Sequence, residues 1–224
     1  MTKVIFGLFA HPDDEAFGVA ATLIKEVQSG TRVYLICATA GEAGTNPDEH
    51  ENLGAVRLEE WQRSAALIGA TDTLHLGYRD GTLCNDDFLP IAGQLEDYIR
   101  SKVAANNSPI ELMSFESNGI SGHLDHILMS RVSQYLYLKL RDELPMRLRL
   151  ACITRDRAPT PNIHWLYMEA GHPSEEIDEI VDARDIFPLH REVMEAHHSQ
   201  RDDYENYHRP RGDEASINYF IVRE

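Results

Sequence analysis

The sequence contains few cysteines and no long apolar run. Its three cysteines, Cys37, Cys84 and Cys152, lie far apart and form no CxxC pair, which is typical of a protein from a reducing compartment. No window approaches the ~18 apolar residues that a membrane-spanning helix needs. His11 and acidic residues follow the short apolar N-terminal run, where a signal peptide would need more apolar length and a cleavage site. We therefore expect a cytoplasmic protein without a membrane anchor.

Positive charge is scarce as well. The chain has 21 Lys and Arg against 37 Asp and Glu, a formal net charge of −16 with neutral histidines. Such a surface repels phosphate backbones and anionic lipids, so we expect neither nucleic acid nor a membrane surface as a partner. Hydrophobic residues make up 42% of the 224 residues, enough for one sizeable core. We expect a single domain over residues 1–224.

Apolar runs and helical periodicities alternate along the chain. Predicted strands cover residues 4–9, 32–38, 71–76, 110–115 and 147–153, and predicted helices cover 17–27, 56–68, 87–104 and 127–140. The less regular last third predicts short strands at 163–168, 177–181 and 217–222, a helix at 188–198 and a polar loop at 204–211. We interpret this loop as solvated, and the alternative is that it covers a substrate. Alternating strands and helices indicate an α/β fold with a mainly parallel sheet and helices on both sides.

Polar clusters follow the first four predicted strands, at residues 11–15, 41–45, 78–81 and 116–126. Ligands of open parallel sheets bind at the carboxyl ends of the strands. The first cluster, His11-Pro12-Asp13-Asp14-Glu15, is almost free of glycine and negatively charged, so it is a poor cradle for a phosphate. NAD, FAD and ATP are therefore not expected as ligands.

The first cluster instead favours a divalent cation. Three carboxylates and an imidazole within five residues repel one another unless a cation lies between them, and His11 and Asp14 can converge across a strand-to-helix turn. A structural alternative is that Asp13 and Asp14 cap the following helix while Glu15 favours its positive end. That alternative leaves His11 without a role.

A second cluster, Gly122-His123-Leu124-Asp125-His126, follows the fourth predicted strand. His123 and His126 are three residues apart at a helix start, so both rings can project from one face, and Asp125 can orient a ring from behind. Two histidines and a carboxylate with open coordination positions form the ligand set of a hydrolytic zinc site.

The two clusters together resemble the signature motifs of the PIG-L/LmbE zinc-dependent N-acetylglucosaminyl de-N-acetylases. Further matches are Arg57 with Glu60, the run from Leu76 to Gly81, and the run from His197 to Gln200. The resemblance extends over about residues 4–222. It implies a Rossmann-like three-layer α/β/α fold.

The resemblance also implies roles for individual residues. One Zn²⁺ per chain would be held by His11, Asp14 and His126. Asp13 would be the general base that deprotonates the metal-activated water, and His123 would stabilise the oxyanion, with the acid that protonates the amine left open. Asp125 would hold the ring of His123 or His126. Arg57 and Asp80 match positions that contact sugar hydroxyls in the family. Apart from the resemblance, His197 on a predicted helix is a further candidate for the substrate site, and the alternative is that it is a helix cap or a salt-bridge partner.

The predicted function is therefore the removal of acetyl from a small N-acetylated amino sugar. Two alternatives stay open. One is an amidase that acts on a thiol conjugate or an antibiotic intermediate, and the other is a non-catalytic metal- or sugar-binding module. The spare acid Asp13 argues against the second, because a structural zinc site closes its coordination with four protein ligands. A homo-oligomer is possible for this family.

Overall fold

The computed structural model describes residues 2–103, 108–158 and 171–224. Its strands are β1 (Val4–Phe9), β2 (Arg32–Thr39), β3 (Asp72–Tyr78), β4 (Ile110–Phe115), β5 (Met146–Cys152), β6 (Glu179–Asp182) and β7 (Ile217–Arg223). Its main helices are α1 (Asp14–Gly18), α2 (Ala20–Gln28), α3 (Leu53–Ile68), α4 (Asn85–Val103), α5 (Leu124–Leu140) and α6 (Phe187–Glu195). Short helical segments cover Ser174–Glu176, Arg184–Ile186, His198–Gln200, Arg201–Asp203, Tyr204–His208 and Arg209–Ser216, the last of which is interrupted by the non-helical backbone of Gly212.

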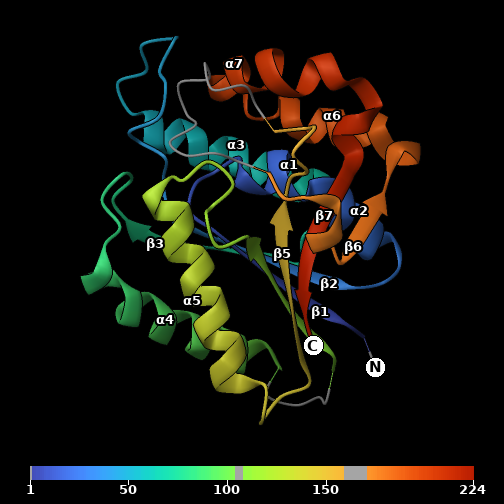
Figure 1. Cartoon of the computed structure of the whole chain (residues 1–224). Coiled ribbons are helices and arrows are strands. Elements are labelled where there is room, and N and C mark those ends of the chain that lie inside the picture. The colour runs from blue at the N-terminus through green and yellow to red at the C-terminus, as the bar shows by residue number, and fades with distance from the viewer. Residues whose placement is uncertain (1, 104–107, 159–170) are drawn as a thin grey trace.

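The strands form one sheet in the order β3-β2-β1-β4-β5-β7-β6 (Figure 1). Strands β1 to β5 pair in parallel, whereas β7 is antiparallel to both β5 and β6. Helices α4 and α5 cover one face, and α1, α2, α3 and α6 cover the other (Figure 1). The predicted three-layer architecture with a mainly parallel sheet is confirmed.

The core lies on both faces of this sheet because β1 is buried along its whole length. Phe6 belongs to the apolar cluster beneath α4 and α5, and its neighbour Ile5 belongs to the cluster beneath α2 and α3. Alternation of side chains along a strand explains this division. The second cluster includes Trp61, which is only 2% exposed.

Strand β1 also lies at the point where the order of the strands across the sheet changes direction. It pairs with β2 on one side and with β4 on the other, so the loops after β1 and β4 are neighbours despite a separation of about a hundred residues. This reversal is the usual ligand site of an open α/β sheet.

Several element boundaries differ from the predicted ones. The helix predicted over 17–27 is broken at Val19, whose φ of −143° separates α1 from α2. Helix α3 begins three residues before the prediction, because the Asn52 side chain accepts a hydrogen bond from the Ala55 amide. The strand predicted over 163–168 lies outside the described residues. The predicted polar loop at 204–211 is helical instead.

Candidate active site

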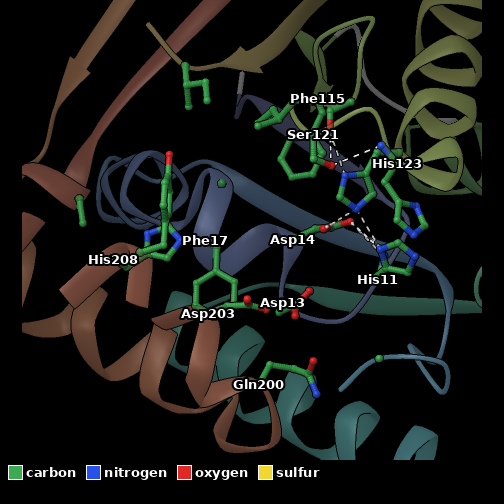
Figure 2. A pocket seen from close by; sticks show the side chains of 18 of the residues that line it. His11, Asp13, Asp14, Phe17, Phe115, Ser121, His123, Gln200, Asp203 and His208 are labelled. Carbon is green, nitrogen blue, oxygen red and sulfur yellow. Dashed lines mark hydrogen bonds and ion pairs between the residues drawn. The ribbon is translucent and has the colours of Figure 1, made fainter. Parts of the chain in front are cut away.

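A cavity of about 530 Å³ opens at the carboxyl ends of β1 to β4. Seven of the nine predicted site residues line it: His11, Asp13, Asp14, Arg57, Asp80, His123 and His126. Figure 2 shows His11, Asp14 and His123 grouped on one side of this cavity, with Asp13 beside Asp14. The loops after neighbouring strands therefore meet as the sequence predicts.

The three predicted metal ligands converge. The Nδ1 atom of His11 lies 2.9 Å from Nε2 of His126, and that Nε2 lies 3.1 Å from Oδ1 of Asp14. The other Asp14 oxygen lies 3.9 Å from Nδ1 of His11. Separations of this size fit ligands of one tetrahedral ion with bonds of about 2 Å. His123 is close by, with a ring nitrogen within 4.8 Å of those of His11 and His126.

Hydrogen bonds behind the two rings decide which nitrogen faces the convergence point. Nε2 of His11 lies 2.9 Å from Asp80 and 3.3 Å from Asp125, so it carries the proton and leaves the Nδ1 lone pair forward. Nδ1 of His126 donates to the carbonyl of Gly119 over 3.1 Å, which leaves its Nε2 lone pair forward. Two lone pairs and a carboxylate then face one point, an arrangement that a divalent cation stabilises. The residues fit a metal.

The electrostatics of the site also favour a cation. Burial lowers the pKa of His11, but the carboxylates of Asp125, Asp80 and Asp14 outweigh it and raise this pKa to about 10. Burial raises the pKa of Asp14, but His126 and His11 hold it well below its usual range. The excess of carboxylate that attracts a proton to the ring attracts a metal ion in the same way.

Gly119 makes the His126 position possible. A Cβ at this residue would lie 2.6 Å from the His126 Cβ, and its φ of +64° is in the left-handed region. Only glycine combines this conformation with so close an approach. The carbonyl that orients the ring therefore depends on the glycine.

Asp13 is held apart from the metal ligands. Its backbone is in an unusual conformation, with a φ of 116°, and its side chain makes no helix-capping hydrogen bond. The Oδ2 atom instead accepts from Nη2 of Arg57 over 2.8 Å. Burial raises the pKa of Asp13 to about 6 against the opposing charge of Arg57. This carboxylate is suited to accept a proton near neutral pH, and the capping alternative for it is wrong.

Arg57, on α3, is 4% exposed, and both of its Nη atoms donate hydrogen bonds to other groups of the protein. Besides Asp13, its Nη atoms bond the carbonyls of Gly41 and Pro12 at 2.7 and 2.6 Å. The guanidinium passes so close to Gly41 that a Cβ there would lie 2.4 Å from it. Arg57 does line the cavity, so its contact with a sugar hydroxyl stays a prediction.

Asp125 and Asp80 both contact the ring of His11, a contact that the sequence does not predict for either, and the contact of Asp80 with a sugar hydroxyl stays a prediction. Asp125 was expected to hold the ring of His123 or His126, but its carboxylate contacts His11 and accepts from the amides of Gly81 and Leu83. Asp80, expected at a sugar hydroxyl, also contacts Nε2 of His11. Both acids follow other strands than His11, so sequence spacing could not reveal that they orient the same ring.

His123 is the N-cap residue of α5. Its Nδ1 accepts from the amide of Asp125 over 3.2 Å, which places the ring proton on Nε2. Burial and then the neighbouring rings of His11 and His126 lower its pKa. His123 is thus a neutral donor at the cavity wall, as an oxyanion-stabilising group requires.

His197 does not line the cavity. Its side chain is fully buried, and its Nε2 lies 2.9 Å from Oε1 of Glu15, which also accepts from Ser64 over 2.5 Å. The other Glu15 oxygen accepts from the Asp13 amide over 3.2 Å. The predicted substrate contact of His197 does not fit this position. The residue instead supports, through Glu15, the strained backbone of Asp13.

We expect His197→Ala to lower the free energy of unfolding by about 3 kcal/mol, because the buried Glu15 loses its imidazole partner and keeps only the Ser64 hydroxyl and the Asp13 amide. The change in KM should be small, since the ring does not reach the cavity. Urea unfolding and steady-state kinetics measure the two effects. His198→Ala, an exposed neighbour, serves as the control, and a large KM increase without destabilisation would contradict this role.

The cavity is also lined by residues beyond the nine predicted site residues, among them Tyr207 and Arg211 from the polar segment that the sequence offers as a possible substrate cover. They are mainly contributed by segments after β5 and α6, and they include Arg157, Gln200, Asp203, Tyr207, His208 and Arg211. The mixture of aromatic and charged residues at 204–211 was the available signal. The sequence predicts a solvated loop there because it does not show that this segment packs on α1, where the His208 ring stacks on Phe17.

The sequence match that bears on the family covers the part of the chain that supplies the predicted metal ligands. The family model described as PIG-L, GlcNAc-PI de-N-acetylase, matches residues 7–136, more than half of the chain. The chain belongs to the PIG-L family. The predicted family is therefore confirmed, and the PIG-L match contains both histidine-acid clusters but ends before His197.

Two curated PIG-L relatives differ in how much of them the chain covers. A 1D-myo-inositol 2-acetamido-2-deoxy-alpha-D-glucopyranoside deacetylase from Acidothermus cellulolyticus is 32% identical over 167 residues, 63% of this chain and 56% of the relative. A probable N-acetyl-alpha-D-glucosaminyl L-malate deacetylase 2 from Bacillus anthracis is 30% identical over 204 residues, 86% of this chain and 79% of the relative. The chain thus spans little more than half of the first relative.

Two solved structures share the fold of this chain. The N,N'-diacetylchitobiose deacetylase from Pyrococcus horikoshii has a TM-score of 0.68 at 21% identity, covering 99% of this chain and 83% of that one. The 4-carboxy-2-hydroxymuconate hydratase GalB from Pseudomonas putida has a TM-score of 0.70 at 14% identity, covering 100% and 97%. Because these two proteins carry different names, the fold by itself does not determine the reaction.

Proposed function

We propose that this protein is a zinc-dependent de-N-acetylase that hydrolyses the acetamide of a small N-acetylglucosamine-type compound to acetate and a free amine. The observation that carries the proposal is the convergence of His11, Asp14 and His126 beside Asp13, a buried carboxylate that is not itself among them. A purely structural metal site has no use for such an acid. The names of the curated relatives support the substrate class.

Each site residue has a separate role in the proposed hydrolysis. A Zn²⁺ ion bound by His11, Asp14 and His126 would supply Lewis acidity and lower the pKa of water. Asp13 accepts the proton of the attacking water, for which it must lie within about 3 Å of that water. His123 donates from Nε2 to the acetamide oxygen as negative charge develops there. Asp80 and Asp125 keep the His11 ring in place.

Among the described residues, no helix has the length and apolar character needed to cross a membrane. A small N-acetylated sugar as substrate fits a cavity of about 530 Å³. The cytoplasmic location, the single domain and a homo-oligomeric state stay predictions from the sequence.

The test combines metal analysis with an acetate-release screen. We expect about one Zn²⁺ per chain and acetate release from small N-acetylglucosamine conjugates. Release only from bulky thiol conjugates or antibiotic intermediates would favour the amidase alternative. Tight sugar binding without turnover in added zinc would favour the binding module, and absence of any bound divalent ion would refute the proposal.

A further inference from the structure

The loop between β4 and α5 has an unusual backbone just before the second histidine-acid cluster. Gly119 and Ile120 both lie in the left-handed region, with φ values of 64° and 63°. Glycine adopts this conformation freely, whereas a β-branched residue such as Ile120 adopts it only at a cost. The Ile120 side chain lines the cavity and packs against the apolar cluster beneath α2 and α3. A strained residue of this kind persists where other contacts hold it.

Glu116, the first residue after β4, supplies those contacts. It is 4% exposed. Its two side-chain oxygens accept hydrogen bonds from the amides of Ile120 and Asn118, over 2.9 and 2.7 Å. Its backbone carbonyl accepts from the amide of Gly119 over 2.8 Å, and Nε2 of His172 lies 3.4 Å from its side chain. One buried glutamate thus fixes the backbone on both sides of Gly119.

The carbonyl of Gly119 connects this loop to the metal site. It accepts from Nδ1 of His126 over 3.1 Å. Phe115 packs against the same ring, with centroids 5.1 Å apart, and restrains its plane, but only the hydrogen bond decides which nitrogen carries the proton. Without the carbonyl in place, the His126 ring would divide between two tautomers. Only one of these offers the Nε2 lone pair to an ion.

We propose that Glu116 is a positioning residue of the metal site, because it holds the loop so that the Gly119 carbonyl faces Nδ1 of His126. This inference rests on the proposed function, since it concerns the same metal ion. Glu116 does not line the cavity, so its effect on the ion passes through Gly119 and His126. Changes to groups that orient a metal ligand from behind typically weaken metal binding about 10–100-fold.

A purely structural role for Glu116 is the alternative, because a buried carboxylate with two amide partners also stabilises the fold. The two roles differ in what they change. A structural role lowers the free energy of unfolding of the metal-free protein and leaves the zinc Kd of the folded fraction unchanged. A positioning role raises that Kd.

The test measures the zinc Kd of the full chain by competition with a chelator, with urea unfolding of the metal-free protein to give the folded fraction. We expect Glu116→Ala to raise the Kd about 10–100-fold. Glu116→Gln keeps the shape and one acceptor oxygen, so it should raise the Kd only about threefold, the value of one weak hydrogen bond. The visible absorption of cobalt-loaded protein, which reports the coordination geometry, should change in Glu116→Ala.

The matched control is Ser117→Ala, a change at the next residue of the same loop. The Ser117 hydroxyl accepts from the side chain of Gln134 over 3.3 Å and does not line the cavity. This variant should keep the wild-type zinc Kd and cobalt spectrum. An equal rise of the Kd in Ser117→Ala would show that any change in the loop weakens zinc binding, and would overturn the assignment to Glu116.

A wild-type zinc Kd in folded Glu116→Ala would also overturn the inference and leave Glu116 a structural residue. If Glu116→Ala does not fold, Glu116→Gln decides in the same way. Zinc binding by the wild type without acetate release from any substrate refutes the proposed function, while a higher Kd in the glutamate variants still supports the inference. Acetate release by the wild type with equal Kd values in all variants does the reverse.

Discussion

Replacing Asp13 with asparagine should lower kcat for acetate release by about 10³-fold while the metal stays bound. The two side chains have nearly the same shape, and the asparagine oxygen can still accept from Arg57, which lies 2.8 Å from the carboxylate. Asparagine cannot take a proton from water. The substitution therefore removes the base and leaves the cavity, the buried arginine and the metal ligands in place.

The pH dependence of the rate of acetate release tests the role of Asp13 in a second way. Burial raises the pKa of Asp13 to about 6, so the wild-type rate should fall as pH drops through this region and the base becomes protonated. A bound cation favours the ionised form and moves this acidic limb lower. The limb should be absent from the residual activity of Asp13→Asn.

The control for this variant is Asp202→Asn, which changes an exposed carboxylate one residue from the cavity-lining Asp203. It should keep wild-type kcat and pH dependence. Full activity in Asp13→Asn, or loss of its metal, would show that Asp13 is not the base but a ligand or a structural residue.

Replacing His126 with alanine should remove the metal and reduce acetate release to roughly 1% of wild type or less. His126 supplies the ligand atom that lies nearest to both other ligands, 2.9 Å from Nδ1 of His11 and 3.1 Å from Oδ1 of Asp14. Without it, two protein ligands remain, too few for tight zinc binding.

Metal analysis after dialysis and acetate release measure this effect, and His198→Ala serves as the exposed control. The wild type should also unfold at a higher temperature with zinc than after chelation, because a ligand that binds only the native state stabilises it. This zinc-dependent shift should be lost in His126→Ala. An alanine variant that keeps one zinc per chain and its activity would exclude His126 as a ligand.

The alternation of buried strands and amphipathic helices was sufficient to predict the three layers, because its period is local and β1 is apolar along its whole length. Element ends were less predictable. The break at Val19 depends on the backbone conformation around Asp13 and on the packing of α1, neither of which leaves a periodic signal. The helical course of residues 204–216 likewise depends on contacts with distant segments.

Two short sequence motifs were sufficient to predict which residues meet in the cavity. His11, Asp13, Asp14, His123 and His126 are close neighbours in two short motifs after two strands, and parallel strands place such motifs at one sheet edge. The residues that support them could not be read from the motifs and become visible when the chain is folded. Asp80 and Asp125 orient His11, and His197 acts through Glu15, because side-chain direction depends on packing between segments far apart in sequence. The same packing brings Arg211 and His208 to the cavity wall.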